Sequence, residues 1–311
     1  MRIAFLDAKT LGDDISLERF KEFGEVEIFQ TTSYEQTLPR VYDADIVVTN
    51  KVVIDSSIMI ESNIKLICVA ATGMNNIDLD FAKKQDIAVK NVAGYSTSSV
   101  VQLTFALALN LINNLSYYDN YTKSDGWLNS DIFTHFTPTF FDLKDKVWGI
   151  IGLGDIGKGV AKVAKSFGCQ VQYYSTSGKN HHDSYKKVEL EELLKQSDII
   201  SIHAPLNSDT KDLINSTNLP LLKDKVVLLN LGRGGIINEK DLAKYIDKSN
   251  IKVALDVLEK EPMSENNPLR KVKNKQNLLI TPHLAWASVE SRQRLVDGIY
   301  QNIKQFLGEK S

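Results

Sequence analysis

Lys146-Val-Trp-Gly-Ile-Ile-Gly-Leu-Gly-Asp-Ile-Gly-Lys158 is the stretch of sequence that decides the fold. Val147–Ile151 is a short apolar run rich in β-branched residues, which predicts a buried strand. Gly152, Gly154 and Gly157 follow with G-x-G-x-x-G spacing and open a helical pattern. The first glycine permits a tight turn, the second lets a pyrophosphate approach the backbone, and the third lets helix and strand pack closely. A strand, this loop and a helix in that order predict a dinucleotide-binding βαβ unit, with the phosphates at the helix N-terminus.

Composition narrows the classes of protein and partner. The 311 residues have room for two domains, and 43% hydrophobic residues are enough for substantial cores. A net charge of −2 gives no basic field for nucleic acid or a membrane surface, so we expect a small-molecule partner. Cys68 and Cys169 lie in separate apolar runs and are predicted to be buried, reduced thiols, which fits a cytoplasmic protein. The N-terminus has no signal-peptide pattern, and polar residues interrupt the most apolar helix, Val100–Leu115, so we expect no membrane span.

Strand-like runs alternate with helical stretches along the whole chain, which predicts parallel α/β sheets. The runs before the glycine motif are Ile3–Leu6, Val26–Phe29, Ile46–Thr49, Leu66–Ala70 and Ile87–Val89, with helical or polar stretches around Leu17–Phe23, Ser56–Glu61 and Leu79–Lys84. Those after it are Gln170–Tyr174, Ile199–His203, Val226–Asn230, Val253–Leu255 and Leu278–Thr281, with helices at Glu189–Gln196, Glu239–Lys248 and Ser288–Leu307. The predicted fold class is α/β with two doubly wound parallel sheets, Rossmann- or flavodoxin-like. A dinucleotide-binding domain, residues 99–283, is inserted into another domain made of residues 1–98 and 284–311.

The segment that precedes the glycine motif has a different character. Ser96–Leu115 predicts one long helix with an apolar stripe, whereas Tyr117–Phe141 is aromatic and polar without a clean period. We predict a projecting arm that buries Trp127 and its tyrosines against another subunit. The alternative is a surface excursion that packs on its own domain.

Three loops in the second half place polar groups directly after predicted strands. Arg233, Glu261 and His283 lie in these loops. Singly, each has an ordinary interpretation: a surface cation, a turn residue before proline, and a hydrogen-bonded loop histidine. Together they supply a guanidinium, a carboxylate and an imidazole at the sheet edge that carries the dinucleotide loop. Hydride transfer to an α-keto acid requires this set of an anion clamp, an orienting carboxylate and an acid/base.

The residue after the second strand of the motif bears on the choice of cofactor. In many NAD-binding units a carboxylate about 20 residues beyond the glycines accepts hydrogen bonds from the ribose. Ser175 stands at that position, followed by Thr176, Ser177, Gly178 and Lys179. No carboxylate is present to repel a 2′-phosphate, and the hydroxyls and ammonium are able to bind it. The loop has no arginine, however, and Lys179 has the alternative of a solvated surface. We expect NADP(H) to be favoured, with NAD(H) used as well.

In order and spacing, these motifs resemble the D-isomer-specific 2-hydroxyacid dehydrogenases over nearly the whole chain. The matching stretches are Ala71–Asp78, Gly152–Gly157, Ser201–Leu206, Asn230–Gly235, Asp256–Pro262 and Thr281–Ser288. The first and last of these are most similar to the glycerate dehydrogenase/hydroxypyruvate reductase branch. The resemblance implies that Arg233, Glu261 and His283 form a catalytic triad. Arg233 would hold the substrate carboxylate, His283 would exchange a proton with the carbonyl oxygen, and Glu261 would orient the imidazole.

The resemblance also extends the candidate site beyond the triad. The cofactor-binding residues are expected to be Thr104, Gly152, Gly154, Asp155, Ile156, Gly157, Ser175, Thr176, Ser177, Lys179, His203, Ala204, Pro205, Thr210, Asn230, Leu231, Gly232 and Asp256. The substrate-binding residues are expected to be Asn50, Lys51, Thr72, Gly73, Met74, Arg233, His283 and Trp286. Residues 1–98 and 284–311 would then bind substrate across a cleft, and the protein would be a homodimer with exchanged arms. His181 and His182 lie in a polar loop and are expected to be solvated. No His, Cys and carboxylate set has metal-ligand spacing, so we expect no metal.

The implied function is hydride transfer between a nicotinamide cofactor and a small D-2-hydroxy acid, with hydroxypyruvate or glyoxylate as the keto acid. Trp286 should wall the pocket and favour short substrates, although the alternative is that it packs in the core. Alternative enzymes are a reductase of another keto acid such as pyruvate, and a 3-phosphoglycerate dehydrogenase, which often carries a regulatory domain for which we expect no room. Formate dehydrogenases pair their histidine with glutamine, where Glu261 stands here. NAD-sensing corepressors share the fold, but we expect their terminal extensions to be absent.

Overall fold

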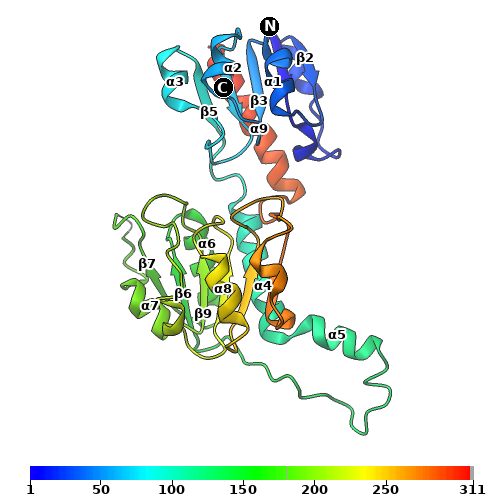
Figure 1. Ribbon diagram of the computed structural model, residues 1–311, viewed down its shortest axis with the longest axis vertical. Helices are drawn as coiled ribbons and strands as arrows, with labels where there is room; N and C mark the ends of the chain where they lie inside the picture. Colours follow the sequence, from blue (N-terminus) through cyan, green and yellow to red (C-terminus); the bar gives the residue numbers. More distant parts are fainter. Residues whose placement is uncertain (180, 309–311) are drawn as a thin grey trace. The chain divides into compact units, whose positions relative to one another are not determined.

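Short apolar runs that alternate with amphipathic helices build two separate parallel sheets (Figure 1). The computed structural model describes residues 1–179 and 181–308. The chain divides into two units: unit 1 comprises Met1–Ser96 with Ala287–Ser311, and unit 2 comprises Thr97–Trp286. The predicted α/β class with two doubly wound parallel sheets is confirmed.

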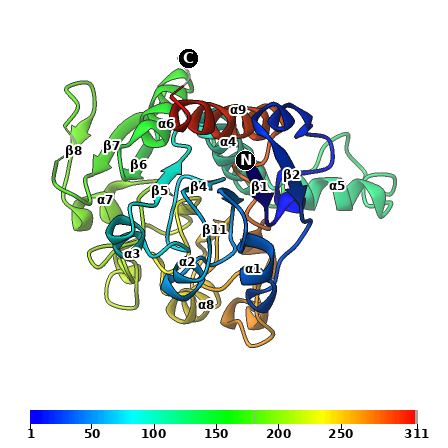
Figure 2. The ribbon, with the colours of Figure 1, turned by 90° about the horizontal axis from the view of Figure 1, so that it is seen from above.

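Unit 1 has a five-stranded sheet in the order β2-β1-β3-β4-β5. The strands are β1 (Arg2–Phe5), β2 (Glu25–Ile28), β3 (Ile46–Thr49), β4 (Leu66–Val69) and β5 (Ala88–Asn91). The helices are α1 (Tyr34–Val41), α2 (Ser56–Ile60), α3 (Leu79–Lys84) and α9 (Val289–Phe306), with 3₁₀ turns η1 (Ala8–Leu11) and η2 (Glu18–Phe23). Helix α9 lies on one face of this sheet, and α1, α2 and α3 lie on the other (Figure 2). All four residues of β3 and of β4 are buried, because both faces are covered.

Unit 2 has a seven-stranded parallel sheet in the order β12-β11-β10-β9-β6-β7-β8. The strands are β6 (Val147–Ile151), β7 (Gln170–Tyr174), β8 (Lys186–Lys187), β9 (Ile199–Ile202), β10 (Val227–Asn230), β11 (Lys252–Leu255) and β12 (Leu278–Ile280). The helices are α4 (Thr97–Asn113), α5 (Leu115–Lys123), α6 (Asp155–Ser166), α7 (Leu190–Gln196) and α8 (Glu239–Ile246), with 3₁₀ turns η3 (Leu219–Leu221), η4 (Pro268–Lys271) and η5 (Lys275–Asn277). The strand order reverses between β6 and β9, which is where open α/β sheets bind ligands.

Two apolar clusters hold the sheet of unit 2, one on each face. One contains side chains of α4 and α6 around the fully buried Trp148, and the other contains side chains of α7 and α8. Cys68 and Cys169 are free and buried, as predicted. Burial raises the pKa of the Cys68 thiol to about 12 and that of the Cys169 thiol to about 11.

The predicted single helix from Ser96 to Leu115 is wrong at its end. Helix α4 stops at Asn113, and Asn114 has a φ of +52°, a left-handed conformation that asparagine tolerates better than most residues. A new helix, α5, starts at Leu115 and takes up the first part of the predicted irregular segment. The rest of that segment projects with α5 away from the sheet (Figure 1). Within the described part of the chain, no single helix is long and apolar enough to cross a membrane; only α4 and α5 together, bent by 57°, reach that length.

Candidate active site

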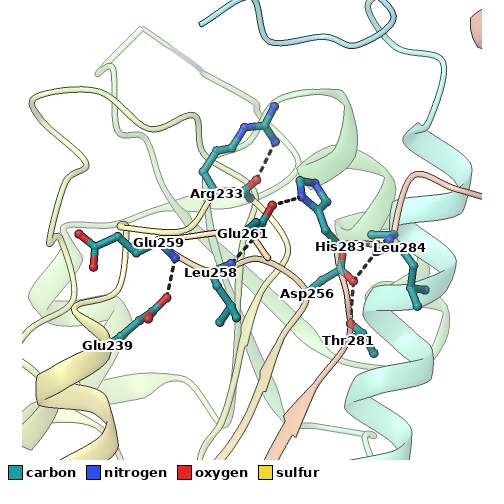
Figure 3. Close-up of polar contacts among 11 residues, drawn as sticks. Arg233, Glu239, Asp256, Leu258, Glu259, Glu261, Thr281, His283 and Leu284 are labelled. Carbon is teal, nitrogen blue, oxygen red and sulfur yellow. Dashed lines mark hydrogen bonds and ion pairs between the residues drawn. The ribbon is translucent and has the colours of Figure 1, made fainter. Parts of the chain in front are cut away.

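Three loops that leave neighbouring strands of unit 2 bring the predicted catalytic residues together. In the parallel register, Asn230 pairs with Leu255, and Leu255 pairs with Ile280, so β10, β11 and β12 end side by side. The loop after β10 carries Arg233, that after β11 carries Glu261, and that after β12 carries His283, and these side chains gather beyond the strand ends (Figure 3).

A short hydrogen bond joins Glu261 to His283. Glu261 Oε2 lies 2.6 Å from His283 Nδ1, and the other carboxylate oxygen accepts the Leu258 backbone N–H at 2.8 Å. Both side chains retain solvent access, with 26% of His283 and 35% of Glu261 exposed. The carboxylate therefore fixes the ring through Nδ1, and Nε2 is the nitrogen that can meet a ligand.

Asp256 fixes the loop that carries His283. Its buried carboxylate accepts hydrogen bonds from the Thr281 hydroxyl at 2.6 Å and from the backbone N–H groups of Leu284 and Ala285, both at 2.9 Å. Burial raises the pKa of Asp256, and these hydrogen bonds oppose that rise. His283 itself has a φ of +51°, a conformation that costs a non-glycine residue about 1–3 kcal/mol. The bonds to Asp256 bracket this strained residue on both sides and hold it in place.

The loop that carries Arg233 is ordered by hydrogen bonds between its backbone and the Asn230 side chain. The Asn230 side chain accepts the Gly232 N–H at 3.1 Å and donates to the Arg233 carbonyl at 2.9 Å. A Cβ on Gly234 would lie 1.8 Å from the Leu258 carbonyl oxygen, so this loop and the loop that carries Glu261 touch through their backbones. The Arg233 side chain is exposed and donates to the Gly232 carbonyl at 2.9 Å. A planar guanidinium held in this way is suited to bind a carboxylate.

The glycine loop between β6 and α6 has the geometry that a dinucleotide requires. Gly152 has a φ of +93°, and a Cβ there would lie 2.8 Å from the Ala204 backbone nitrogen. A Cβ on Gly157 would lie 2.3 Å from the Gly152 carbonyl oxygen, which explains the close approach of helix and strand. A Cβ on Gly154 would meet nothing within 4 Å, so open space lies directly above the N-terminus of α6. Asp155 and Ile156 form the first turn of that helix. This cradle fits a pyrophosphate.

His203 adjoins this cradle and is neutral. Its backbone N–H donates to the Ile151 carbonyl at 2.8 Å, which places the residue beside the end of β6. Both ring nitrogens are buried and have no hydrogen-bond partner among the described residues. Burial lowers the pKa of His203 to about 3. Thr210 closes the same loop by donating to the Pro205 carbonyl at 2.7 Å. An orphaned imidazole at this point fits a polar ligand held by the loop.

The segment after β7 presents the hydroxyls expected near a ribose. Ser175 is buried, Thr176 is half-buried, and the Ser177 hydroxyl accepts the backbone N–H of Lys179 at 3.3 Å. Lys187, which the sequence analysis did not identify, donates to the Gly178 carbonyl at 3.2 Å. The pairing of β8 with β7 brings this second ammonium to the loop, and a short lysine-containing strand was too weak a pattern to predict it.

Four further residues that were predicted to contact cofactor or substrate have defined positions in unit 2. Thr104 is buried on α4 and its hydroxyl donates to the Val100 carbonyl at 2.7 Å. A Cβ on Gly232 would lie 2.8 Å from the Ala204 carbonyl oxygen, so the backbone here is tightly packed, and the adjoining Leu231 is buried. Trp286 follows the His283 loop and is half-buried. Their roles toward cofactor and substrate stay predictions.

Unit 1 carries the other predicted substrate-side residues. Asn50 and Lys51 directly follow β3, and the buried carboxylate of Asp7 accepts both backbone N–H groups, at 2.9 Å and 2.7 Å. Asp7 was not among the predicted site residues; it directly follows a predicted strand, but the sequence does not reveal its burial or its partners after β3. Thr72–Met74 lie in the loop after β4, where the Thr72 hydroxyl donates to the Val92 carbonyl at 3.2 Å. No group of three or more His, Cys, Asp or Glu residues in the described ranges has a geometry that could hold a metal ion.

Comparisons with known proteins found similar sequences and a similar solved structure. The family model for the NAD binding domain of D-isomer specific 2-hydroxyacid dehydrogenases matches residues 105–285. A putative 2-hydroxyacid dehydrogenase of Haemophilus influenzae is 37% identical, over 99% of this chain and 98% of that protein. A hydroxypyruvate reductase of Blautia hydrogenotrophica is 35% identical, over 99% of this chain and 97% of that protein. The solved structure of an acyclic imino acid reductase in complex with NADPH and D-Arg superposes with a TM-score of 0.87 at 27% identity, over 99% of this chain and 97% of that one.

The second and third glycines of the motif provide a matched test of the cradle. Gly157→Ala forces a methyl group against the Gly152 carbonyl and should destabilise the protein by about 1–3 kcal/mol, seen as a lower Tm. Gly154→Ala meets no protein atom, so its Tm should equal that of the wild type. Its methyl group fills the space for the pyrophosphate, and the Kd for NAD(P)H, measured by fluorescence titration, should rise more than about tenfold. An unchanged Kd for Gly154→Ala would contradict the cradle.

Proposed function

We infer the activity from one premise: this chain belongs to the D-isomer specific 2-hydroxyacid dehydrogenase family. It is an oxidoreductase that uses a nicotinamide cofactor and acts on a small 2-hydroxy or 2-keto acid. We propose that it interconverts D-glycerate and hydroxypyruvate and also reduces glyoxylate. The observation that carries this proposal is the 2.6 Å bond between Glu261 and His283, next to a loop that presents an exposed guanidinium from Arg233.

Each polar group has a defined task in the reduction. A nicotinamide cofactor held in the cradle of unit 2 would supply the hydride that the keto acid accepts at C2. Arg233 binds the substrate carboxylate through its planar fork and polarises the adjacent carbonyl. His283 gives the proton on Nε2 to the carbonyl oxygen, so hydride and proton together form the alcohol, and in oxidation the neutral ring takes that proton back. Glu261 accepts from Nδ1–H and stabilises the imidazolium that donates.

Other residues of unit 2 would place the cofactor. The open space above Gly154 and the N–H groups of the first turn of α6 would hold the pyrophosphate. His203, with two unpaired ring nitrogens, would offer a neutral donor or acceptor beside it. We propose that NADP(H) is favoured and that NAD(H) is used as well. The hydroxyls of Ser175–Ser177 and the ammonium groups of Lys179 and Lys187 support binding of a 2′-phosphate.

We also propose a homodimer in which the segment after α5 contacts a second copy. Between Ser124 and Asp142 this segment has no helix or strand, and it exposes large apolar side chains. Leu128 is 80% exposed, Phe133 88% and Phe136 71%. Exposing such a cluster of apolar side chains to water is unfavourable, and contact with the same segment of a second copy would bury them.

The catalytic assignment is tested by replacing His283. His283→Ala should lower kcat by about 10²–10⁴-fold, because it removes the acid/base group, and should leave the Kd for NAD(P)H nearly unchanged. Arg233→Ala should raise KM for the keto acid and also lower kcat. His181→Ala is the matched control, since His181 is an exposed loop histidine paired with Asp183. Near-normal steady-state turnover in His283→Ala would refute the assignment.

Substrate size tests the proposed activity itself. We propose that the Trp286 indole narrows the pocket, so hydroxypyruvate and glyoxylate should have a higher kcat/KM than branched or aromatic keto acids. The measurement is NAD(P)H oxidation at about 340 nm with a panel of 2-keto acids, on wild type and Trp286→Ala. The smaller side chain should raise the relative rate of the larger acids. A wild-type kcat/KM that is higher for phenylpyruvate than for hydroxypyruvate would count against the proposed substrate.

Cofactor preference is tested at the loop after β7. Ser175→Asp should shift kcat/KM toward NADH, because a carboxylate repels the 2′-phosphate. Lys179→Ala should weaken NADPH more than NADH, by the loss of a charge-assisted contact of about 1.5–3 kcal/mol. Lys186→Ala is the control, since Lys186 pairs with Glu192 instead of the loop. A wild-type enzyme that strongly prefers NADH would disprove the preference and leave the dehydrogenase assignment intact.

A further inference from the structure

Glu239 is a buried carboxylate outside the triad, and the mechanism above gives it no task. It is the first residue of α8 and is 7% exposed. One carboxylate oxygen accepts a hydrogen bond from the backbone N–H of Glu259 at 2.6 Å, and the other accepts one from the Asn267 side-chain amide, Nδ2–H, at 2.7 Å. Among the described residues it has no ion pair with a lysine, arginine or histidine. A buried charge without a cation costs stability, and an apolar side chain of the same size is often the more stabilising choice. Its contacts therefore indicate that it holds neighbouring segments of the chain in place.

The contact with Glu259 fixes the segment that ends in Glu261. Figure 3 shows Glu239 reaching up from α8 to the Glu259 backbone, two residues before the triad carboxylate. The segment is also held on two other sides. The Leu258 carbonyl oxygen packs where a side chain on residue 234 would lie, which only glycine permits. The Leu258 N–H donates to Glu261 Oε1 at 2.8 Å. With these contacts in place, the other oxygen of Glu261 is presented to His283.

The position of Glu239 in the chain adds a second link. The loop that carries Arg233 runs directly into α8, whose first residue is Glu239. The Asn238 side chain caps this helix by accepting the Asp241 N–H at 3.0 Å, so the first turn is rigid. The Glu239 carboxylate therefore ties the element that carries Arg233 to the element that carries Glu261.

We propose that Glu239 is a positioning residue for the reaction, which acts through the Glu259 backbone and Glu261 to hold the orientation of the His283 imidazole. The proposal rests on the proposed function. Because Glu239 lies below the loop and is buried, it acts through other residues and not on the substrate.

The variants are chosen to remove the contacts of Glu239 with Glu259 and with Asn267 separately or together. Glu239→Leu removes both acceptors and leaves the Glu259 N–H unpaired. Glu239→Gln keeps one acceptor oxygen, which can still receive the Glu259 N–H, and is the conservative rescue. Asn267→Ala removes the contact on the other side and the cap on Leu269, without touching the segment that carries Glu261. It is the matched control for loss of stability alone. Glu239→Ala, which leaves room for water to satisfy both donors, replaces the leucine variant if that variant does not fold.

Turnover and stability are measured on the same proteins. Glu239→Leu should lower kcat about 10–100-fold, because small displacements of catalytic groups have effects of that size, with KM and the Kd for NAD(P)H within about twofold of wild type. Glu239→Gln should recover most of kcat, and Asn267→Ala should lower Tm but keep kcat.

A double-mutant cycle with Glu261→Gln separates an effect of Glu239 through Glu261 from an effect that is independent of Glu261. If Glu239 acts through Glu261, its effect on kcat should shrink to within about twofold in the Glu261→Gln background. Equal losses in both backgrounds, or an Asn267→Ala variant as slow as Glu239→Leu, would overturn the proposal.

A second readout does not depend on the substrate. The imidazole N–H that is hydrogen-bonded to Glu261 should give a downfield proton resonance in the full-length protein, assigned by its loss in His283→Gln. This resonance should shift or disappear in Glu239→Leu and persist in Asn267→Ala. An unchanged resonance in a folded Glu239→Leu protein refutes the positioning role, whatever keto acid the enzyme uses. Failure of His283→Ala to lose turnover, by contrast, refutes the proposed function while this measurement still decides the role of Glu239.

Discussion

Parallel strand pairing is the constraint on which the site of unit 2 depends. Since β6, β9, β10, β11 and β12 run in one direction, their carboxyl ends lie at one edge of the sheet, and every loop that leaves them starts there. Apolar clusters on both faces fix the sheet, so the origins of these loops are rigid. The functional groups themselves lie on the loops, a few residues beyond the strands. Their orientation therefore depends on contacts that the sheet does not supply.

Buried carboxylates supply those contacts in both units. Asp256 accepts backbone N–H groups on the C-terminal side of His283, Glu239 accepts one just before Glu261, and Asp7 accepts two after β3. A carboxylate suits this task because it offers several acceptor sites, and its hydrogen bonds are stronger than those of a neutral group. The desolvation cost offsets much of the stabilisation. Removing such a carboxylate leaves buried N–H groups unpaired, which costs about 1–3 kcal/mol for each group.

The sequence predicted the elements far better than the contacts between loops. Apolar runs and glycine spacing determine strands, helices and the dinucleotide turn, because burial imposes a period on the chain. Helix α1 was missed, although Ser33 and Gln36 form a capping box that signals its start. The break at Asn114 was missed because hydrophobic periodicity does not register a single left-handed residue. Asp7 and Glu239 were missed for another reason: each is one acidic residue whose partners lie far along the chain. Only the fold reveals that they are buried.

Two histidines, His203 and His283, lie in loops that start at the same edge of the sheet. Their surroundings differ, and each suits its histidine to a different role. His203 is enclosed at the end of β9, its ring nitrogens have no hydrogen-bond partner among the described residues, and burial lowers its pKa to about 3, which favours the neutral ring. His283 keeps solvent access, and Glu261 contacts one of its two nitrogens. In the proposed mechanism, the carboxylate orients the ring through Nδ1 and leaves Nε2 to exchange the proton. Burial without a partner thus suits the first ring to bind a ligand, whereas partial exposure with a partner suits the second to act as the acid and base.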